Sequence, residues 1–164
     1  MKILKYITLV TLMCASCFGL AHDESHKNSS AQQYKNKAIP KISVQLWSVK
    51  DELKSDFKGT LTKIANMGFD GVEFAGDFGP YANDAKGLKS FLDSLGLIAS
   101  SAHVKFDVFE AEHFEQTVAF YKAIGTDTLI NPWDERAWDV NKVDGFIADL
   151  TSLHTKLKAE GFHF

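Results

Sequence analysis

Polar and aromatic side chains that could do chemistry fall at the ends of short apolar runs in this sequence. Glu73 stands between Val72 and Phe74, and a buried carboxylate is costly unless it is paired or ligating. We therefore predict that Glu73 belongs to an active site, with a structural ion pair as the alternative. His103 ends an uncharged run and could donate a hydrogen bond to a substrate oxygen, carry a proton or bind a metal ion. A satisfied core histidine is the alternative for His103, and we predict that the two residues are catalytic.

Four further residues are predicted to bind substrate: Gln45, Trp47, Asn131 and Trp133. Indole rings stack on the apolar face of a sugar ring, although large aromatic side chains often only pack. His113 and His154 fall on helical segments, where a solvent-exposed face explains them better. Asp51, Glu52 and Asp56 are interpreted as loop and helix-start charges, because carboxylates favour a helix N-terminus.

The residues that position these side chains alternate between strand-like runs and segments with helical spacing. Strands are predicted at residues 42–47, 71–74, 97–103 and 128–131, and a fifth is predicted to open at residues 162–164. Helical stripes follow the first four strands and end at Gly68, Gly96, Gly125 and Gly161. We interpret this order as βα units on a parallel sheet, whose active site lies at the carboxyl ends of the strands.

The strand starts recur about every 26 to 34 residues, a spacing that fits either a (β/α) barrel or an open doubly wound sheet. No Gly-x-Gly-x-x-Gly follows the first strand, which argues against dinucleotide binding. An eight-unit barrel takes about 250 residues. We therefore predict an α/β fold of the TIM-barrel type, truncated in residues 40–164 to about four βα units and the start of a fifth strand.

The amino-terminal residues have the composition of an export signal. Residues 1–21 carry two lysines, an apolar run and small residues before a cleavage point, so we predict a signal peptide. The apolar run is shorter than the roughly 20 residues of a membrane-spanning helix, so no transmembrane segment is expected. We predict a periplasmic or secreted protein, with a lipoprotein anchored at Cys17 as the alternative. Residues 22–39 are polar and are predicted to be a flexible tether.

Charge and cysteine content exclude several functional classes. The chain of 164 residues has 18 Lys and Arg against 21 Asp and Glu, and Arg136 is its single arginine. Phosphate recognition depends on clustered basic residues, so we expect no nucleic-acid partner. Both cysteines, Cys14 and Cys17, precede residue 21, so the rest of the chain has no disulfide, thiolate zinc site or cysteine nucleophile.

Several segments taken together resemble the sugar phosphate isomerase/epimerase family, which has the xylose isomerase-like TIM barrel. The segments are residues 45–53, 56–61, 71–76, 101–103 and 131–133. Their order and spacing match over residues 41–164, and the resemblance covers only the amino-terminal half of the family's barrel.

The resemblance implies a small-molecule sugar substrate and a divalent metal ion such as Mn²⁺. In the family, carboxylates and a histidine on later strands hold the ion while two glutamates move protons next to a sugar carbonyl. Those ligands are expected mostly beyond Phe164. Glu73 and His103 correspond to polar residues that line the family's pocket, and Trp47 to an aromatic residue in its wall. His163 precedes the family's Tyr-His-Asn-His-like segment and receives no catalytic role.

Our functional expectation is an exported sugar isomerase or epimerase, present here as an incomplete fragment that is inactive alone. One alternative is a lyase or hydratase acting on keto-sugars or keto-glycosides, because proton abstraction next to a carbonyl can end in elimination. Another is a non-catalytic carbohydrate-binding protein or a nonfunctional truncated chain. A DNA-repair endonuclease on the same fold is disfavoured by export, by charge and by the single arginine. An oligomer that closes the barrel is conceivable.

Overall fold

The computed structural model describes residues 39–164, and residues 40–164 form one compact unit. The predicted signal peptide, the lipid anchor at Cys17 and nearly all of the predicted tether lie outside the described residues.

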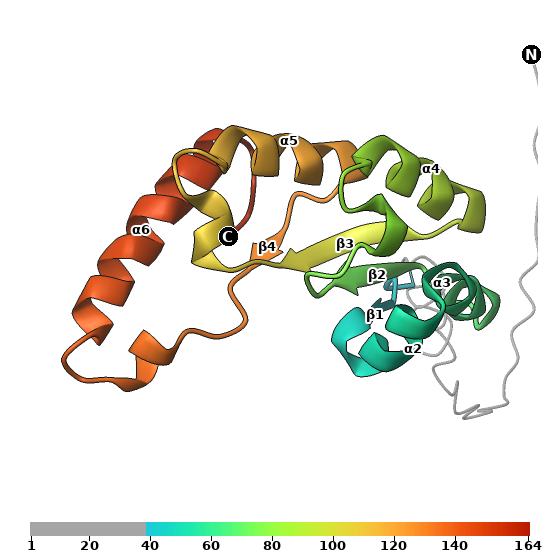
Figure 1. The fold of residues 1–164 in the computed structure, drawn as a ribbon, viewed down its shortest axis with the longest axis horizontal. Coiled ribbons are helices and arrows are strands. Elements are labelled where there is room, and N and C mark those ends of the chain that lie inside the picture. The colour runs from blue at the N-terminus through green and yellow to red at the C-terminus, as the bar shows by residue number, and fades with distance from the viewer. Residues whose placement is uncertain (1–38) are drawn as a thin grey trace, which may run out of the picture. The chain divides into compact units, whose positions relative to one another are not determined.

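Four parallel strands form one sheet in the order β1-β2-β3-β4, so each strand pairs with the next one along the chain (Figure 1). The strands are β1 (Ser43–Gln45), β2 (Gly71–Phe74), β3 (Ile98–His103) and β4 (Leu129–Ile130). Parallel neighbours need a crossover connection, and each crossover here contains a helix. The predicted α/β class is therefore confirmed, and the carboxyl ends of all four strands meet at one edge.

Within residues 39–164, five α-helices lie between or after the strands: α2 (Lys50–Ser55), α3 (Phe57–Asn66), α4 (Ala85–Leu95), α5 (Phe114–Ile124) and α6 (Val143–Ala159). Short 3₁₀ turns precede α2, α4, α5 and α6: η1 (Leu46–Val49), η2 (Gly79–Tyr81), η3 (Phe106–Phe109) and η4 (Glu135–Trp138). Asp56 begins α3 by accepting a hydrogen bond from the Gly59 main-chain nitrogen at 2.9 Å, as expected for a helix-start charge. Gly96 and Gly125 end α4 and α5 with positive φ angles of 71° and 85°, as the sequence predicts.

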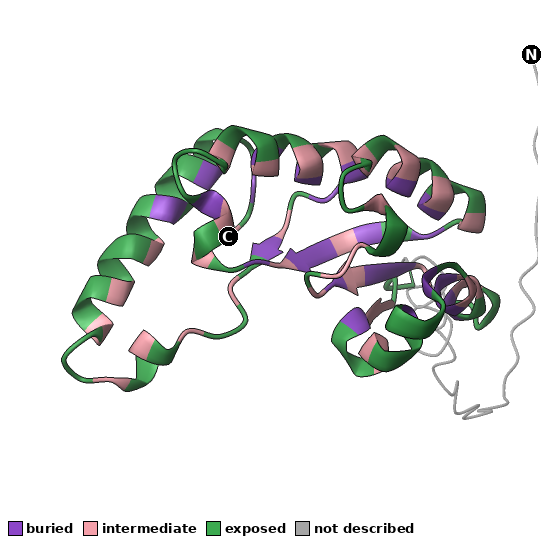
Figure 2. Ribbon diagram, in the orientation of Figure 1, coloured by how far each residue is buried: buried purple, intermediate pink, exposed green. Residues whose placement is uncertain are grey.

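The core lies between the sheet and its helices (Figure 2). Val72 and Phe74 of β2 are fully buried, as are Leu88 and Leu92 of α4. Side chains alternate between the two faces of a strand, so Glu73 points away from this core. The opposite face of the sheet therefore carries the predicted polar residues.

An irregular register between β2 and β3 decides which β3 side chains share that polar face. Val72 pairs with Ala99 but Glu73 pairs with Ser101, so Ser100 is an extra residue on β3. Such a bulge redirects the side chains that follow it. Ser101 and His103 consequently lie on the same face as Glu73.

The structure departs from the sequence expectations in three elements. The first strand ends at Gln45, so Trp47 lies on η1 and not on a strand. The helix α2 was not expected, because its six residues are too short to show a helical period. The predicted fifth strand is present as a single parallel bridge between Thr128 and His163. Within residues 39–164, no helix has the length and apolarity that crossing a membrane requires.

Candidate functional site

Glu73 is the central residue of the polar face. It lies on β2 between Val72 and Phe74, whose burial fixes the direction of its side chain. On one side its register partner is Gln45 of β1, and on the other it is Ser101 of β3. The structure thus brings three neighbouring strands together at this carboxylate.

Both oxygens of the Glu73 carboxylate have partners on β3. Oε1 lies 3.0 Å from Nε2 of His103, and Oε2 accepts a hydrogen bond from the Ser101 hydroxyl at 2.5 Å. The Glu73 and His103 side chains are 19% and 20% exposed, so a ligand can reach the pair although most of its surface is covered. The two residues predicted to be catalytic are therefore in direct contact.

A carboxylate beside an imidazole can hold and move protons, which is the chemistry of general acid and base catalysis. Ser101 adds a donor that fixes the second oxygen, so the carboxylate cannot rotate freely between partners. Ser101 was missed as a site residue, because nothing in the sequence marks the bulge that turns it toward Glu73.

Gln45 lies beside Glu73 in the register and is half-buried. Its main-chain oxygen accepts a hydrogen bond from the Ser48 hydroxyl at 2.6 Å, which helps turn the chain from β1 into η1. Among residues 39–164, nothing donates to or accepts from its side-chain amide, which leaves that amide available to a ligand.

Trp47 borders a small hollow of about 130 Å³ that also involves Leu53, Lys54 and Asp77. The Trp47 side chain is 60% exposed, and the Lys50 ammonium lies 5.4 Å from the centre of its ring system. This hollow sits where β1 and β2 end, beside the short helix α2.

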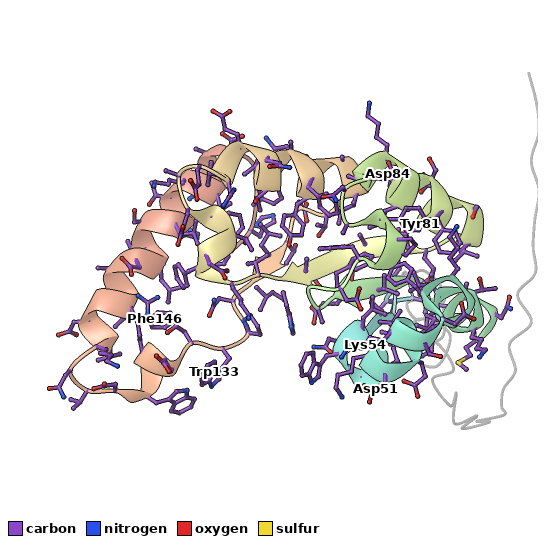
Figure 3. All side chains as sticks on the ribbon, viewed as in Figure 1. Asp51, Lys54, Tyr81, Asp84, Trp133 and Phe146 are labelled. Atoms are coloured by element: carbon purple, nitrogen blue, oxygen red, sulfur yellow. The ribbon has the colours of Figure 1, made fainter. Side chains whose placement is uncertain are left out.

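Asn131 and Trp133 follow β4 and border a different hollow, of about 340 Å³. The Asn131 amide donates to the Val104 main-chain oxygen at 3.3 Å and ties the ends of β3 and β4 together. Trp133 is 64% exposed on the loop after β4 (Figure 3). The two hollows share no lining residue, so the structure does not bring Trp47 and Trp133 to one pocket.

Lys105 is a second residue that sequence reasoning missed. It follows β3, is exposed, and lines the hollow beside Trp133. Its position two residues after His103 was the available signal, because charged residues just past a strand end belong to the same edge as the site.

Arg136 fixes the loop that carries Asn131 and Trp133. Its guanidinium binds both carboxylate oxygens of Asp134, at 3.0 and 2.9 Å, and Asp149 of α6 at 2.6 Å. The hydrogen bond from Arg136 lowers the pKa of the Asp134 carboxyl, and the bond from Asp134 in turn raises the pKa of Arg136. The guanidinium carbon also lies 5.1 and 5.2 Å from the ring centres of Phe106 and Phe146.

Solved structures with this arrangement of strands and helices are TIM-barrel enzymes. A sugar phosphate isomerase/epimerase from Parabacteroides distasonis is 21% identical, with a TM-score of 0.52 over 77% of this chain and 50% of its own. Another from the same organism is 19% identical, with a TM-score of 0.55 over 74% and 51% of the two chains. An AP endonuclease of family 2 from Brucella melitensis is 20% identical, with a TM-score of 0.51 over 76% and 53%. The chain has a partial TIM-barrel fold.

This partial barrel spans about half the length of the solved chains that it matches. No protein-family model and no curated protein matches the sequence. The fold class predicted from strand spacing is thus confirmed, and at these identities the likeness shows the fold alone.

The described half of the barrel does not by itself fit a divalent metal ion. Within residues 39–164, no three side chains of His, Cys, Asp or Glu converge as a metal site would require. Glu73 Oε1 and His103 Nε2 face each other and not a common point.

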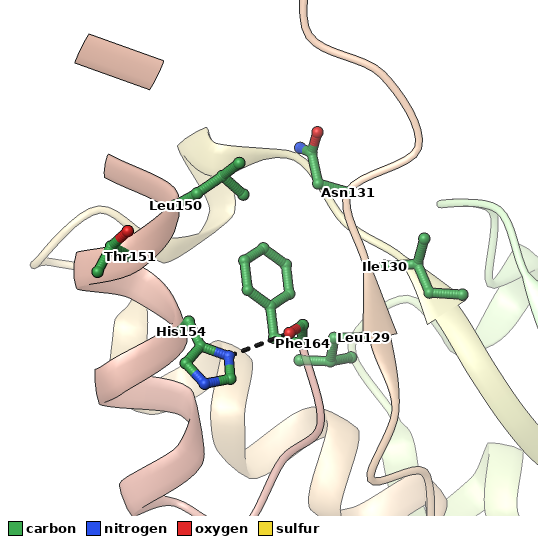
Figure 4. A pocket seen from close by; sticks show the side chains of 7 residues that line it. All are labelled: Leu129, Ile130, Asn131, Leu150, Thr151, His154 and Phe164. Atoms are coloured by element: carbon green, nitrogen blue, oxygen red, sulfur yellow. Dashed lines mark hydrogen bonds between the residues drawn. The ribbon is translucent and has the colours of Figure 1, made fainter. Parts of the chain in front are cut away.

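Of the two histidines expected on helical segments, His154 lies on α6, whereas His113 lies in the turn just before α5. His113 is exposed, and its Nε2 is 3.3 Å from Glu112. His154 is exposed on α6, where Nδ1 lies 3.1 Å from the Phe164 main-chain oxygen beside a hollow of about 510 Å³ (Figure 4). Asp51 and Glu52 lie in the first turn of α2, which confirms their interpretation as helix-start charges.

Proposed function

We propose that the carboxyl edge of the sheet binds a sugar or a sugar derivative, and that the whole protein moves protons next to a sugar carbonyl as an isomerase or epimerase. The observation that carries the proposal is the contact between Glu73 and His103, at the edge where barrel enzymes hold their substrates. Two solved structures with this fold are described as sugar phosphate isomerase/epimerases, which supports the proposal.

The residues around the pair have the chemistry that a sugar requires. The Gln45 amide offers both donors and an acceptor to hydroxyl groups. Trp133 offers an apolar face, and Lys105 beside it offers a cation to an anionic substituent. A substrate that reaches from the pair to Trp133 would use the ends of β2, β3 and β4 together.

Two further parts of the proposal concern the whole protein. We propose that a divalent metal, where the reaction uses one, is completed by residues outside the described range. We also propose export directed by residues 1–21, with lipid attachment at Cys17 as the alternative. Amino-terminal sequencing and the mass of the mature protein separate these routes, since cleavage after residue 21 leaves no acyl chain and lipidation leaves Cys17 acylated.

The test is calorimetric titration of the full chain with a panel of aldoses, ketoses and sugar phosphates. Glu73→Gln keeps the side-chain shape but removes the charge, and we expect it to weaken binding by tenfold or more, about 1.4 kcal/mol. Glu112→Gln is the matched control, because the Glu112 side chain is 74% exposed and its ion-pair partner is His113, which is not a predicted site residue. We expect it to bind as the wild type does. The proposal would be refuted if no sugar bound, or if Glu73→Gln and Glu112→Gln lost sugar affinity equally.

Product analysis on the longest available form of the protein separates the chemical classes. Interconversion of epimers or of aldose and ketose supports an isomerase, whereas an unsaturated product indicates a lyase or hydratase. Sugar binding without turnover indicates a carbohydrate-binding protein. Cleavage of an oligonucleotide that contains an abasic site would instead favour the activity named for the Brucella melitensis structure.

A further inference from the structure

The contacts of Glu73 leave little room for it to touch a substrate. Its Oε1 faces His103 Nε2 at 3.0 Å, and its Oε2 accepts the Ser101 hydrogen bond at 2.5 Å. Ser101 is buried, so its hydroxyl has no access to a ligand except through Glu73. Both oxygens of the carboxylate are thus directed at the protein itself.

The second ring nitrogen of His103 is placed differently. Among residues 39–164, no hydrogen bond reaches Nδ1 of His103, and no buried side-chain nitrogen or oxygen lacks a partner. The His103 side chain is 20% exposed. Nδ1 is therefore not fully buried.

The charge of Glu73 decides which ring nitrogen carries the proton of a neutral imidazole. An ionised carboxylate only accepts hydrogen bonds, so it attracts an N–H and repels a nitrogen lone pair. At 3.0 Å this favours the proton on Nε2. The lone pair is then on Nδ1, which is not fully buried.

The bulge at Ser100 makes this arrangement possible. With a regular register Glu73 would face Ser100, and His103 would point toward the helices, because side chains alternate along a strand. The extra residue turns both Ser101 and His103 to the face of Glu73.

We propose that His103 Nδ1 is the reactive atom of the site, and that Glu73 and Ser101 are positioning residues that hold the ring and its tautomer. This assignment rests on the proposed function for its ligand, a sugar hydroxyl. Nδ1 accepts the hydroxyl hydrogen bond and then takes the proton: the O–H bond breaks, an N–H bond forms, and the electron pair stays on the sugar oxygen. The imidazolium produced is stabilised by the Glu73 carboxylate, which keeps its own charge.

Alkylation with bromoacetate tests which nitrogen is free. The nitrogen lone pair displaces bromide from carbon, so an N–C bond forms, bromide leaves with the bonding electrons, and the ring then loses its other proton to water. Peptide mapping and comparison with the two carboxymethylhistidine isomers identify the nitrogen at each histidine. His154 is an internal control for which the other nitrogen should react. Its Nδ1 faces the Phe164 main-chain oxygen, and among residues 39–164 no hydrogen bond reaches its Nε2.

For the wild-type chain we expect carboxymethylation of His103 at Nδ1 and of His154 at Nε2. In Glu73→Ala, the His103 product should shift several-fold toward Nε2, while the His154 product stays unchanged. Ser101→Ala should give a smaller shift in the same direction. Nitrogen-15 NMR of the imidazole rings at about pH 9, where free imidazole is neutral, should show His103 protonated on Nε2.

Modification of wild-type His103 at Nε2, or a ring protonated on Nδ1, would overturn the assignment whether or not any sugar binds. Because the wild-type chain alone decides this, a variant that fails to fold does not weaken the test. If Nδ1 is free but no sugar of the panel binds, the tautomer assignment stands and the proposed function fails. The two conclusions are therefore tested separately.

Discussion

Tyr121 of α5 shows how burial of one titratable residue links stability to pH. The ring is buried beside Phe78 and Phe120, and desolvation raises the pKa of Tyr121 to about 12. An unfolded tyrosine has a pKa near 10. The contribution of Tyr121 to the free energy of unfolding is therefore constant below pH 10 and falls as pH rises toward 12. In that interval the folded state still holds a proton that the unfolded state has released. We expect a loss of roughly 2–3 kcal/mol across that interval.

Urea unfolding of the wild type and of Tyr121→Phe at a series of pH values from 9 to 12 measures this loss. Lysine side chains titrate in both proteins, so the difference between the two curves isolates the tyrosine. We expect the difference to be flat below pH 10 and then to fall. Parallel curves throughout would show that the Tyr121 hydroxyl ionises as freely in the folded chain as in the unfolded one.

The sequence alone predicts some of the site residues but not others. Glu73 could be placed because it is one charge between two apolar residues of a strand, and His103 because it ends an uncharged strand. Ser101 could not, because its direction depends on one extra residue in β3, and a bulge leaves no mark in composition. The separation of Trp47 and Trp133 into two hollows was also beyond prediction, since it depends on where the loops after β1 and β4 turn.

At the scale of elements, the first residue of β2 must be a glycine because β1 and β3 lie close to it on either side. A Cβ on Gly71 would lie 2.7 Å from the Ile98 main-chain oxygen and 2.8 Å from the Ser43 hydroxyl. We predict that Gly71→Ala destabilises the chain by about 1–3 kcal/mol, because β1 and β3 must move apart to admit the methyl group. Thermal or urea unfolding, followed by circular dichroism, measures the change.

Gly145 is the matched control for this substitution. It lies inside α6, where a Cβ would meet nothing within 4 Å. Alanine is a better helix former than glycine, so we expect Gly145→Ala to stabilise the chain by up to about 1 kcal/mol. If the two variants change stability in the same direction, the close approach at Gly71 does not limit the sheet.

Most helices and strands could be predicted from the hydrophobic periodicity and from the glycines that end helices. β2 has the predicted bounds, and the glycines after α4 and α5 end those helices as expected. β1 is shorter than predicted because the chain turns into η1 at Leu46, although Leu46 is as apolar as a strand residue. The apolar stripe of α6 is buried unevenly, because Ile147 is 53% exposed while Leu153 and Leu157 are buried. Periodicity identifies a helix, but the neighbours that cover each turn are set by the tertiary structure.

At the scale of the whole molecule, the order of strands and helices follows from sequence spacing, but the long-range polar contacts do not. Arg136 links η4 to α6 through Asp149, and to Phe106 and Phe146 through their rings. No local pattern joins these residues, which are up to 43 positions apart in the sequence. The arginine nevertheless connects the loop after β4 to α6 and to η3.

We predict that Arg136→Lys loosens this loop without loosening the sheet. Lysine lacks the planar fork that binds both oxygens of Asp134, and its ammonium cannot bridge to Asp149 at the same time. Amide hydrogen exchange of residues 134–149 should become several-fold faster, while residues of β2 and β3 keep wild-type rates. We call the hydrogen bonds of Arg136 with Asp134 and Asp149 the Arg136 clamp. The pKa of Asp134 is lowered because its charged form binds Arg136. In the wild type the clamp therefore holds at neutral pH and weakens as pH falls below the ordinary aspartate range.

Lys142→Met is the control that distinguishes loss of the Arg136 clamp from loss of a positive charge elsewhere in the same segment. Lys142 lies in the same segment but has one ion pair, to Asp139 at 3.5 Å, and it contacts no second element through its charge. We expect its exchange rates to match the wild type. If Arg136→Lys speeds exchange in the sheet as well as the loop, then the loop and the sheet open as one unit. In that case Trp133 would be held by the global stability of the barrel and not by Arg136.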